Sequence, residues 1–211
     1  MIIKVCGMRE PENIRAVEAT GIDWMGFIFF PKSPRFVENV PDYLPQQSKR
    51  VGVFVNASID EIVEKIKPFQ LQLIQLHGKE TPAFCRELRR RIPADMKIIK
   101  MIPISTRNDI QMADSYTNDV DFFLFESKIP TDGGTYGGSG QQFDWSILQR
   151  YQGSVPFLLT GGIGEEDAEQ IAHFHHPQFI GIDLNSRFET APALKDTKKI
   201  RAFVDKIRNL A

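Results

Sequence analysis

IIKVCGM, residues 2–8, is the stretch of sequence that indicates the fold. Residues 2–5 are mostly β-branched and apolar, which predicts a short buried strand. Cys6 closes this strand and Gly7 breaks it, so we expect a thiol at a rigid strand end, beside a residue that lets a ligand approach the backbone. A lone buried cysteine is more often structural than reactive. Whether Cys6 is reactive or structural therefore depends on whether the other strands also end in polar residues.

Apolar runs recur along the chain, and each is followed by helix or turn signals. Because the runs are continuous rather than alternating, we expect strands that are buried on both faces, as in a parallel sheet. Eight strand-then-helix units, with no composition shift that would mark a linker, predict a single α/β domain over residues 1–211, a (β/α)8 barrel. A doubly wound sheet is the alternative, but it would need fewer units and a switch-point crevice. After the first strand, we expect strands at residues 24–30, 51–55, 71–76, 97–102, 122–125, 155–159 and 179–182.

The expected helices differ in strength. Residues 59–66 carry apolar side chains at i, i+3, i+4 and i+7, which predicts an amphipathic helix that Pro68 stops. A weak helix is expected over residues 42–47, and a helix with a poor apolar stripe over residues 106–116.

Composition excludes several classes of protein. Hydrophobic residues make up 42% of the chain and the net charge is −1, so we expect no nucleic-acid partner and no membrane-binding patch. No apolar run reaches the roughly 18 residues of a membrane helix. The two cysteines, Cys6 and Cys85, have no metal-ligand spacing, so no metal site is expected. Free thiols and the absence of a secretory leader favour the cytoplasm, and we expect a monomer rather than a homodimer.

Polar residues follow the expected strands, where a barrel of this type carries its active site. Each residue alone could be structural, but the fold would bring these strand ends to one mouth. A Cys6 thiolate could remove a carbon-bound proton, and a Glu126 carboxylic acid opposite could donate one. The strand-end residues are Cys6, Arg35, Gln75, His77, Glu126, Asp183 and Ser186.

Phosphate is the expected ligand group, because such barrels often hold it between the loops after strands seven and eight. Gly161 and Gly162 leave backbone N–H groups uncovered, and Asn185 and Ser186 add donors. The alternative is that the glycines only permit tight turns. The glycine-rich segment 132–140 is expected either as a lid that excludes water or as a flexible insertion.

Several spaced motifs, in one order along almost the whole chain, resemble those of phosphoribosylanthranilate isomerase of tryptophan biosynthesis. They are KVCGM (residues 4–8), GFIF with PKSPR (26–29 and 31–35), VGVFVN (51–56), QLHG (75–78), GGSG with FDW (137–140 and 143–145) and GG (161–162). The resemblance implies an Amadori rearrangement of N-(5-phosphoribosyl)anthranilate to 1-(2-carboxyphenylamino)-1-deoxyribulose 5-phosphate, without a cofactor or metal.

In that family, an acid on strand six opens the furanose ring and the strand-one cysteine takes the C2 proton. The resemblance therefore implies that Cys6 is the base and Glu126 the acid. It implies that Arg35 grips the anthranilate part of the substrate, and we expect Gln75 and His77, from their place at a strand end, to bind the substrate as well. It places the phosphate at Gly161, Gly162, Asp183, Asn185 and Ser186.

Three features depart from the family pattern. The strand-six acid is usually aspartate, whereas this chain has Glu126. Arg187 stands where many members have a small residue, and it could contact phosphate or face solvent. The loop 131–136 is longer than expected.

Two other functions remain open at this point. One is a related sugar-phosphate barrel enzyme. The histidine-pathway isomerase would need an acid in place of Cys6, and indole-glycerol-phosphate synthase would need catalytic lysines inside the barrel. Lys4 lies in the first strand, but the other catalytic lysines are not matched in this sequence. A non-catalytic phosphosugar-binding barrel would need neither Cys6 nor Glu126.

Overall fold

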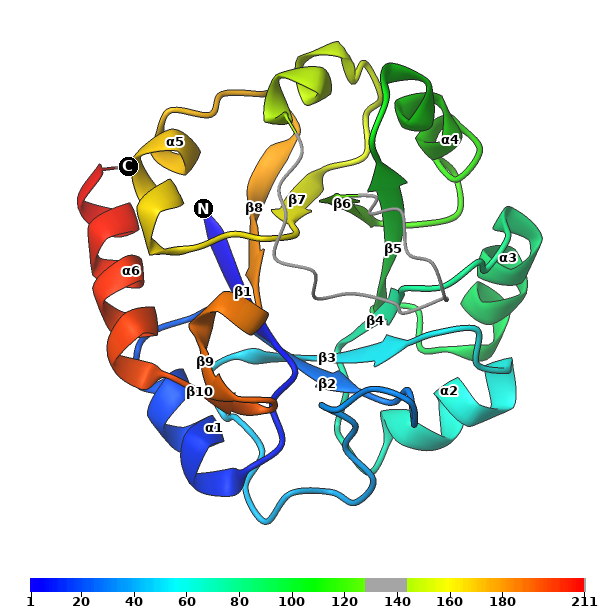
Figure 1. The fold of residues 1–211 in the computed structure, drawn as a ribbon. Helices are drawn as coiled ribbons and strands as arrows, with labels where there is room; N and C mark the ends of the chain where they lie inside the picture. The colour runs from blue at the N-terminus through cyan, green and yellow to red at the C-terminus, as the bar shows by residue number, and fades with distance from the viewer. Residues whose placement is uncertain (128–143, 211) are drawn as a thin grey trace.

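The computed structural model describes residues 1–127 and 144–210, so the glycine-rich segment 132–140 and the loop 131–136 lie outside the described residues. Eight parallel strands close into a barrel in chain order, and helices ring it (Figure 1). The expected fold class is confirmed. The strands are β1 Ile2–Cys6, β2 Trp24–Ile28, β3 Lys49–Phe54, β4 Leu73–Leu76, β5 Lys97–Ile104, β6 Phe122–Ser127, β7 Phe157–Thr160 and β8 Phe179–Leu184.

Helical segments follow most strands and differ widely in length. The side chains of Ser58, Thr81, Asp144 and Asp196 accept from backbone N–H groups in the first turn of four of these segments. The α-helices are α1 Pro11–Glu18, α2 Ile59–Ile66, α3 Pro82–Arg91, α4 Gln111–Asp114, α5 Ala168–Ala172 and α6 Thr197–Leu210. The 3₁₀ turns are η1 Arg107–Ile110, η2 Trp145–Arg150, η3 Glu165–Asp167 and η4 Ser186–Phe188.

Both faces of each strand are buried, which explains the continuous apolar runs. In β1, Ile3 and Val5 belong to the large core between the strands and the helices, whereas Cys6 belongs to the small cluster inside the barrel. Side chains alternate along a strand, so Lys4 shares the inner face with Cys6. A fully buried lysine thus stands inside the barrel, one layer below the thiol.

The barrel closes between β1 and β8. Ile2 pairs with Gly181 and Lys4 pairs with Asp183 in the parallel register. A Cβ atom on Gly181 would lie 2.1 Å from the carbonyl oxygen of Ile2, so only glycine fits where these two backbones meet. The register therefore places Lys4 directly beside Asp183.

The expected helix over residues 42–47 is wrong; this segment is irregular. Pro45 lacks an N–H group and disfavours the helical conformation of the residue before it. The N–H groups of Gln47 and Ser48 instead donate to the carboxylate of Glu18, at 2.6 and 3.0 Å. These backbone N–H groups thus find hydrogen-bond acceptors in a distant side chain instead of in a helix.

The expected helix over residues 106–116 is split into η1 and the short α4. The carboxylate of Asp109 accepts from the N–H groups of Ser105 and Thr106, at 2.9 and 2.7 Å. This local capping favours a tight first turn, in keeping with the poor apolar stripe of the segment.

A small hairpin after β8 was not expected. It consists of β9 Glu189–Ala191 and β10 Leu194–Lys195. The side-chain amide of Asn13 in α1 pairs with the backbone of Lys195, accepting from its N–H at 2.8 Å and donating to its C=O at 2.9 Å. This pairing fixes the hairpin beside the end of β1, where Glu189 and Lys195 reach the barrel mouth.

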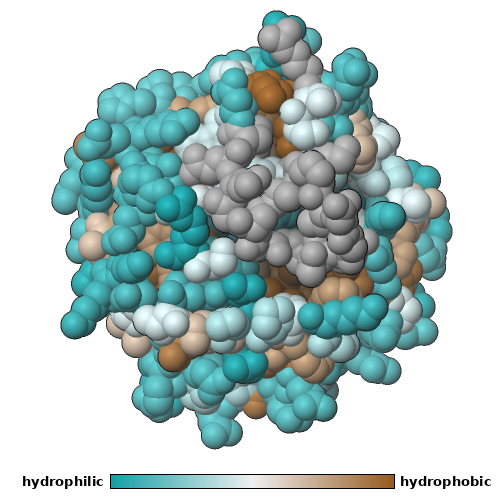
Figure 2. All heavy atoms as spheres, viewed as in Figure 1, coloured by the Kyte–Doolittle hydropathy of each residue, from teal (hydrophilic) through white to brown (hydrophobic). Residues whose placement is uncertain are grey.

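Hydrophilic side chains predominate on the molecular face shown in Figure 2, and hydrophobic ones form small, separate groups. Among the described residues, no helix combines the length and apolar character that crossing a membrane requires.

Candidate active site

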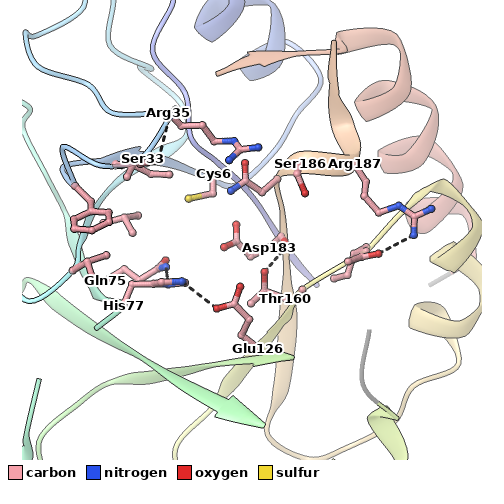
Figure 3. Close-up of a pocket in the computed structure, with 18 residues that line it drawn as sticks. Cys6, Ser33, Arg35, Gln75, His77, Glu126, Thr160, Asp183, Ser186 and Arg187 are labelled. Atoms are coloured by element: carbon pink, nitrogen blue, oxygen red, sulfur yellow. Dashed lines mark hydrogen bonds and ion pairs between the residues drawn. The ribbon is translucent and has the colours of Figure 1, made fainter. Parts of the chain in front are cut away.

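A pocket opens at the carboxyl ends of the strands, inside the barrel mouth (Figure 3). All of the site residues expected from the sequence line this one pocket, although they come from six strands or the loops that follow them. They are Cys6, Arg35, Gln75, His77, Glu126, Gly161, Gly162, Asp183, Asn185 and Ser186; Thr160 and Arg187 line it as well.

Cys6 ends β1 on the inner face and is only 4% exposed. Its register partner on β2 is Gly26, where a Cβ atom would lie 2.8 Å from the Cys6 sulfur. The absent side chain thus makes room for the thiol. Burial raises the pKa of Cys6, Lys4 opposes this shift, and Asp183 adds to it. The thiol is therefore protonated in part or in full near neutral pH, and the surrounding charges control its ionisation.

Lys4 and Asp183 form an ion pair below the thiol, with 2.8 Å between Nζ and Oδ2. Both side chains are buried, at 0% and 5% exposure. Burial lowers the pKa of Lys4, but the contacts with Asp183 and Cys6 outweigh burial and raise it above its ordinary value. Lys4 is therefore expected in its charged form at neutral pH. The second oxygen of Asp183, Oδ1, has no hydrogen-bond partner among the described residues, and Figure 3 shows this carboxyl between Cys6 and Glu126.

Gln75, His77 and Glu126 form a hydrogen-bonded chain on the other side of the pocket. The amide Nε2 of Gln75 lies 2.9 Å from Nδ1 of His77, and Nε2 of His77 lies 3.1 Å from Oε2 of Glu126. His77 and Glu126 are partly open to the pocket, at 13% and 15% exposure. The glutamate carboxyl thus has a proton-sharing partner at the barrel mouth.

The amide of Gln75 determines which nitrogen of His77 carries the proton. As placed, Gln75 donates to Nδ1, and its own buried Oε1 has no partner among the described residues. Turning the amide over would bring Oε1 to Nδ1–H and leave Nε2 of His77 free to accept from a protonated Glu126. The two orientations of the amide differ in which Gln75 atom lacks a partner among the described residues, and each goes with a different tautomer of His77.

Arg35 reaches the pocket from the loop after β2 and is held by Glu189. Its Nε lies 2.8 and 3.0 Å from the two carboxylate oxygens, and its Nη2 lies 2.6 Å from one of them. Hydrogen bonding to Glu189 raises the pKa of Arg35. The Nζ of Lys195 also donates to this carboxylate, at 2.6 Å, and to the Oδ1 of Asn185, at 2.7 Å. The guanidinium is thus fixed in one orientation at the pocket wall.

The loops after β7 and β8 meet at the edge of the pocket. Gly161 and Gly162 have φ values of +92° and +70°, which L side chains rarely adopt. Arg187 turns toward these glycines, because its Nη1 donates to the carbonyl of Gly162 at 3.0 Å and its guanidinium pairs with Glu166. The two glycines therefore serve a tight turn here and also face the pocket.

Sequence reasoning missed the partners of the expected residues. Glu189 and Lys195 lie on the hairpin that was not expected. The sequence indicated no role for Lys4, because the other catalytic lysines of a related enzyme are not matched. One signal was present for Lys4, since a charged residue inside an apolar strand needs a buried partner. No comparable signal pointed to Glu189, which lies 154 positions from Arg35.

Comparisons with known proteins show the family of the chain. The family model of N-(5′-phosphoribosyl)anthranilate isomerase matches residues 3–206. The N-(5′-phosphoribosyl)anthranilate isomerase of Phocaeicola vulgatus is 51% identical over 208 residues, which are 99% of this chain and 98% of the relative.

Two solved structures are similar over essentially the whole chain. The phosphoribosyl anthranilate isomerase of Thermotoga maritima has a TM-score of 0.83 and 30% identity, covering 99% of this chain and all of that one. A phosphoribosyl anthranilate isomerase in complex with reduced 1-(o-carboxyphenylamino)-1-deoxyribulose 5-phosphate has a TM-score of 0.79 and 27% identity, with the same coverage. On the strength of the family match and these relatives, the chain belongs to the N-(5′-phosphoribosyl)anthranilate isomerase family.

Proposed function

We propose that this barrel mouth converts N-(5-phosphoribosyl)anthranilate to 1-(2-carboxyphenylamino)-1-deoxyribulose 5-phosphate in tryptophan biosynthesis, by acid and base catalysis from Glu126 and Cys6. The observation that carries this proposal is that a thiol and a carboxyl face one pocket from opposite sides (Figure 3). The relative that holds a reduced form of the product supports the same substrate class.

Glu126 begins the reaction as the acid. It gives its proton to the furanose oxygen, the C1–O bond breaks with its electron pair going to that oxygen, and an iminium forms between C1 and the anthranilate nitrogen. His77 lies 3.1 Å from Glu126 and returns a proton to the carboxylate afterwards.

Cys6 completes the reaction as the base. Its thiolate removes the C2 proton, the C–H electron pair forms the C1–C2 double bond, and the C1–N π pair moves to the nitrogen, which gives an enolamine. The enolamine then takes up a proton at C1 and loses the proton of its C2 hydroxyl, so that C2 becomes the ketone carbon. No electrons enter or leave overall, so the residues of the pocket suffice for an isomerisation.

Arg35 is the proposed partner of the anthranilate carboxylate. A guanidinium binds a carboxylate through parallel N–H groups, and Glu189 already holds this one in a fixed orientation. Gln75 and His77 complete the substrate-binding wall and act through Glu126.

The direct test of the function is an activity assay. The purified chain should remove the fluorescence of freshly made N-(5-phosphoribosyl)anthranilate in a first-order progress curve. The product should be the ribulose phosphate, identified by mass and borohydride reduction. Loss of fluorescence that yields free anthranilate would be hydrolysis, and it would contradict the proposal.

Phosphate binding gives a second expected result. The site is proposed at Gly161, Gly162, Asn185 and Ser186, with Asp183 at its inner border. A crystal soaked in phosphate or sulfate should hold the anion between the two loops, with backbone N–H groups among its ligands. An anion bound only at the opposite end of the barrel would overturn this assignment.

We also infer a cytoplasmic monomer. Both cysteines are free and buried, as in proteins of reducing compartments. We expect a monomer, whereas a Thermotoga maritima relative is described as dimeric.

A further inference from the structure

Lys4 is a buried cation for which the proposed reaction has no role. Its side chain is 0% exposed, and it lies on the inner face of β1, two residues before Cys6. Burying an ammonium costs several kcal/mol unless it is well paired. A buried charge inside the barrel therefore suggests a role that an apolar side chain such as methionine could not fill.

The Lys4 ammonium lies against the Cys6 thiol as well as against Asp183. The space that a Cβ atom of Gly26 would fill is 2.8 Å from the Cys6 sulfur and 3.3 Å from the Lys4 nitrogen. The two groups therefore border the same small space, and the charge of Lys4 favours the ionised form of Cys6. Asp183 anchors the ammonium from β8, at 2.8 Å. The ammonium thus bridges a carboxylate and the sulfur.

The charged groups around Cys6 carry one more positive charge than negative charge when the thiol is neutral. On the near side of the pocket, the cations are Lys4, Lys195 and Arg35, and the carboxylates are Asp183 and Glu189. Three cations against two carboxylates balance when the thiol is ionised. Across the pocket, His77 and Glu126 pair with each other and do not change this balance.

We propose that Lys4 is the positioning residue of Cys6: its ammonium, anchored by Asp183, stabilises the thiolate and holds the sulfur where it can take the C2 proton. This inference rests on the proposed role of Cys6 as the base. In the proton transfer the C2–H bond breaks and the S–H bond forms, while Lys4 keeps its own protons throughout. The negative charge of Asp183 disfavours the thiolate, whereas its side-chain oxygen, which an asparagine would keep, anchors the ammonium.

The test is the pH dependence of Cys6 alkylation, measured without substrate. A Cys85→Ala background removes the second thiol, which is buried in the core with its pKa raised to about 11 by burial. Iodoacetamide is the reagent, and the midpoint of the alkylation rate against pH is the readout. This midpoint reports ionisation and does not depend on how easily the reagent enters.

Three variants give three different expected shifts. Lys4→Met should raise the midpoint by about one pH unit or more, which leaves roughly tenfold less thiolate at neutral pH. Asp183→Asn should lower the midpoint, because a repelling charge is lost while the ammonium stays. The double variant Lys4→Met/Asp183→Asn should lie above the parent but below Lys4→Met.

The double variant also keeps the test valid if Lys4→Met fails to fold. A single replacement leaves Asp183 buried and unpaired, which is strongly destabilising, whereas replacing both charged groups removes that penalty. A purely structural ion pair would change the temperature of unfolding and leave the alkylation midpoint where it was.

Coincident midpoints for the parent and the double variant would overturn the proposal, whatever happens to activity. Failure of the catalytic role of Cys6 would appear separately, as undiminished turnover in a Cys6→Ser protein. The two ideas therefore fail in different experiments.

Discussion

Replacing Cys6 with serine should lower kcat by about 10² to 10⁴, the range expected when a general base is lost. A hydroxyl is close in size to a thiol, so Gly26 still leaves room for it, but it is a far weaker base at neutral pH. KM should change little, because the sulfur acts on the reacting carbon and adds little to ground-state binding. Steady-state fluorescence kinetics of the purified variant would measure both constants.

The matched control is Cys85→Ser. Cys85 is the other buried cysteine, on the core-facing side of α3, and it does not line the pocket. Its replacement should reduce stability modestly and leave kcat close to the parent. A Cys6→Ser enzyme that works at the parental rate, with Cys85→Ser equally active, would show that the strand-end thiol is only structural.

The ionisation of Cys6 also predicts the direction of the pH dependence. Burial raises the pKa of this thiol, so the thiolate fraction grows as the pH rises through neutrality. The acidic limb of kcat/KM should therefore rise with pH in the parent and be absent or displaced in Cys6→Ser.

Replacing Glu126 with glutamine should lower kcat by at least about 10², because an amide cannot donate the proton that opens the ring. The glutamine side chain has the same shape and can still hydrogen-bond to His77, which lies 3.1 Å from the carboxylate. The fold of the mouth is therefore retained, and the loss can be assigned to the proton. Single-turnover measurements would show whether the ring-opening step is the one that slows.

The Glu126→Asp variant tests the departure from the family pattern. Shortening the side chain withdraws the carboxyl from His77 and from the ring oxygen by about 1 Å or more, and misplacement of that size costs about 10² in rate. We therefore expect aspartate to be worse than glutamate in this barrel. Parental activity in Glu126→Gln would exclude Glu126 as the acid and direct the search to Asp183, or to Asp132, which lies outside the described residues.

The sequence alone predicted the fold class and that the expected site residues would line one pocket. Strands that are apolar on both faces need cover on both sides, and eight of them, separated by helices, close most simply into a barrel. Once the barrel is closed, every strand end faces one mouth. The residues at those ends, from Cys6 to Ser186, were therefore found together as expected.

Irregular segments were predicted less well, because distant groups decide their conformation. The segment 42–47 has weak helical preferences of its own. It takes its shape from Pro45 and from the carboxylate of Glu18, which lies 29 positions before Gln47. No local pattern contains that information.

Only the tertiary structure decided which groups pair within the pocket. Lys4 meets Asp183 across 179 positions because β8 joins β1 in one particular register. Arg35 meets Glu189 because Asn13 fixes the hairpin beside the end of β1. The physical reason is that the local sequence shows which side chain stands at the end of a strand. Which charged group it pairs with depends on how the barrel closes and on the register of the strands. The pKa of Cys6 and the orientation of Arg35 follow from those partners.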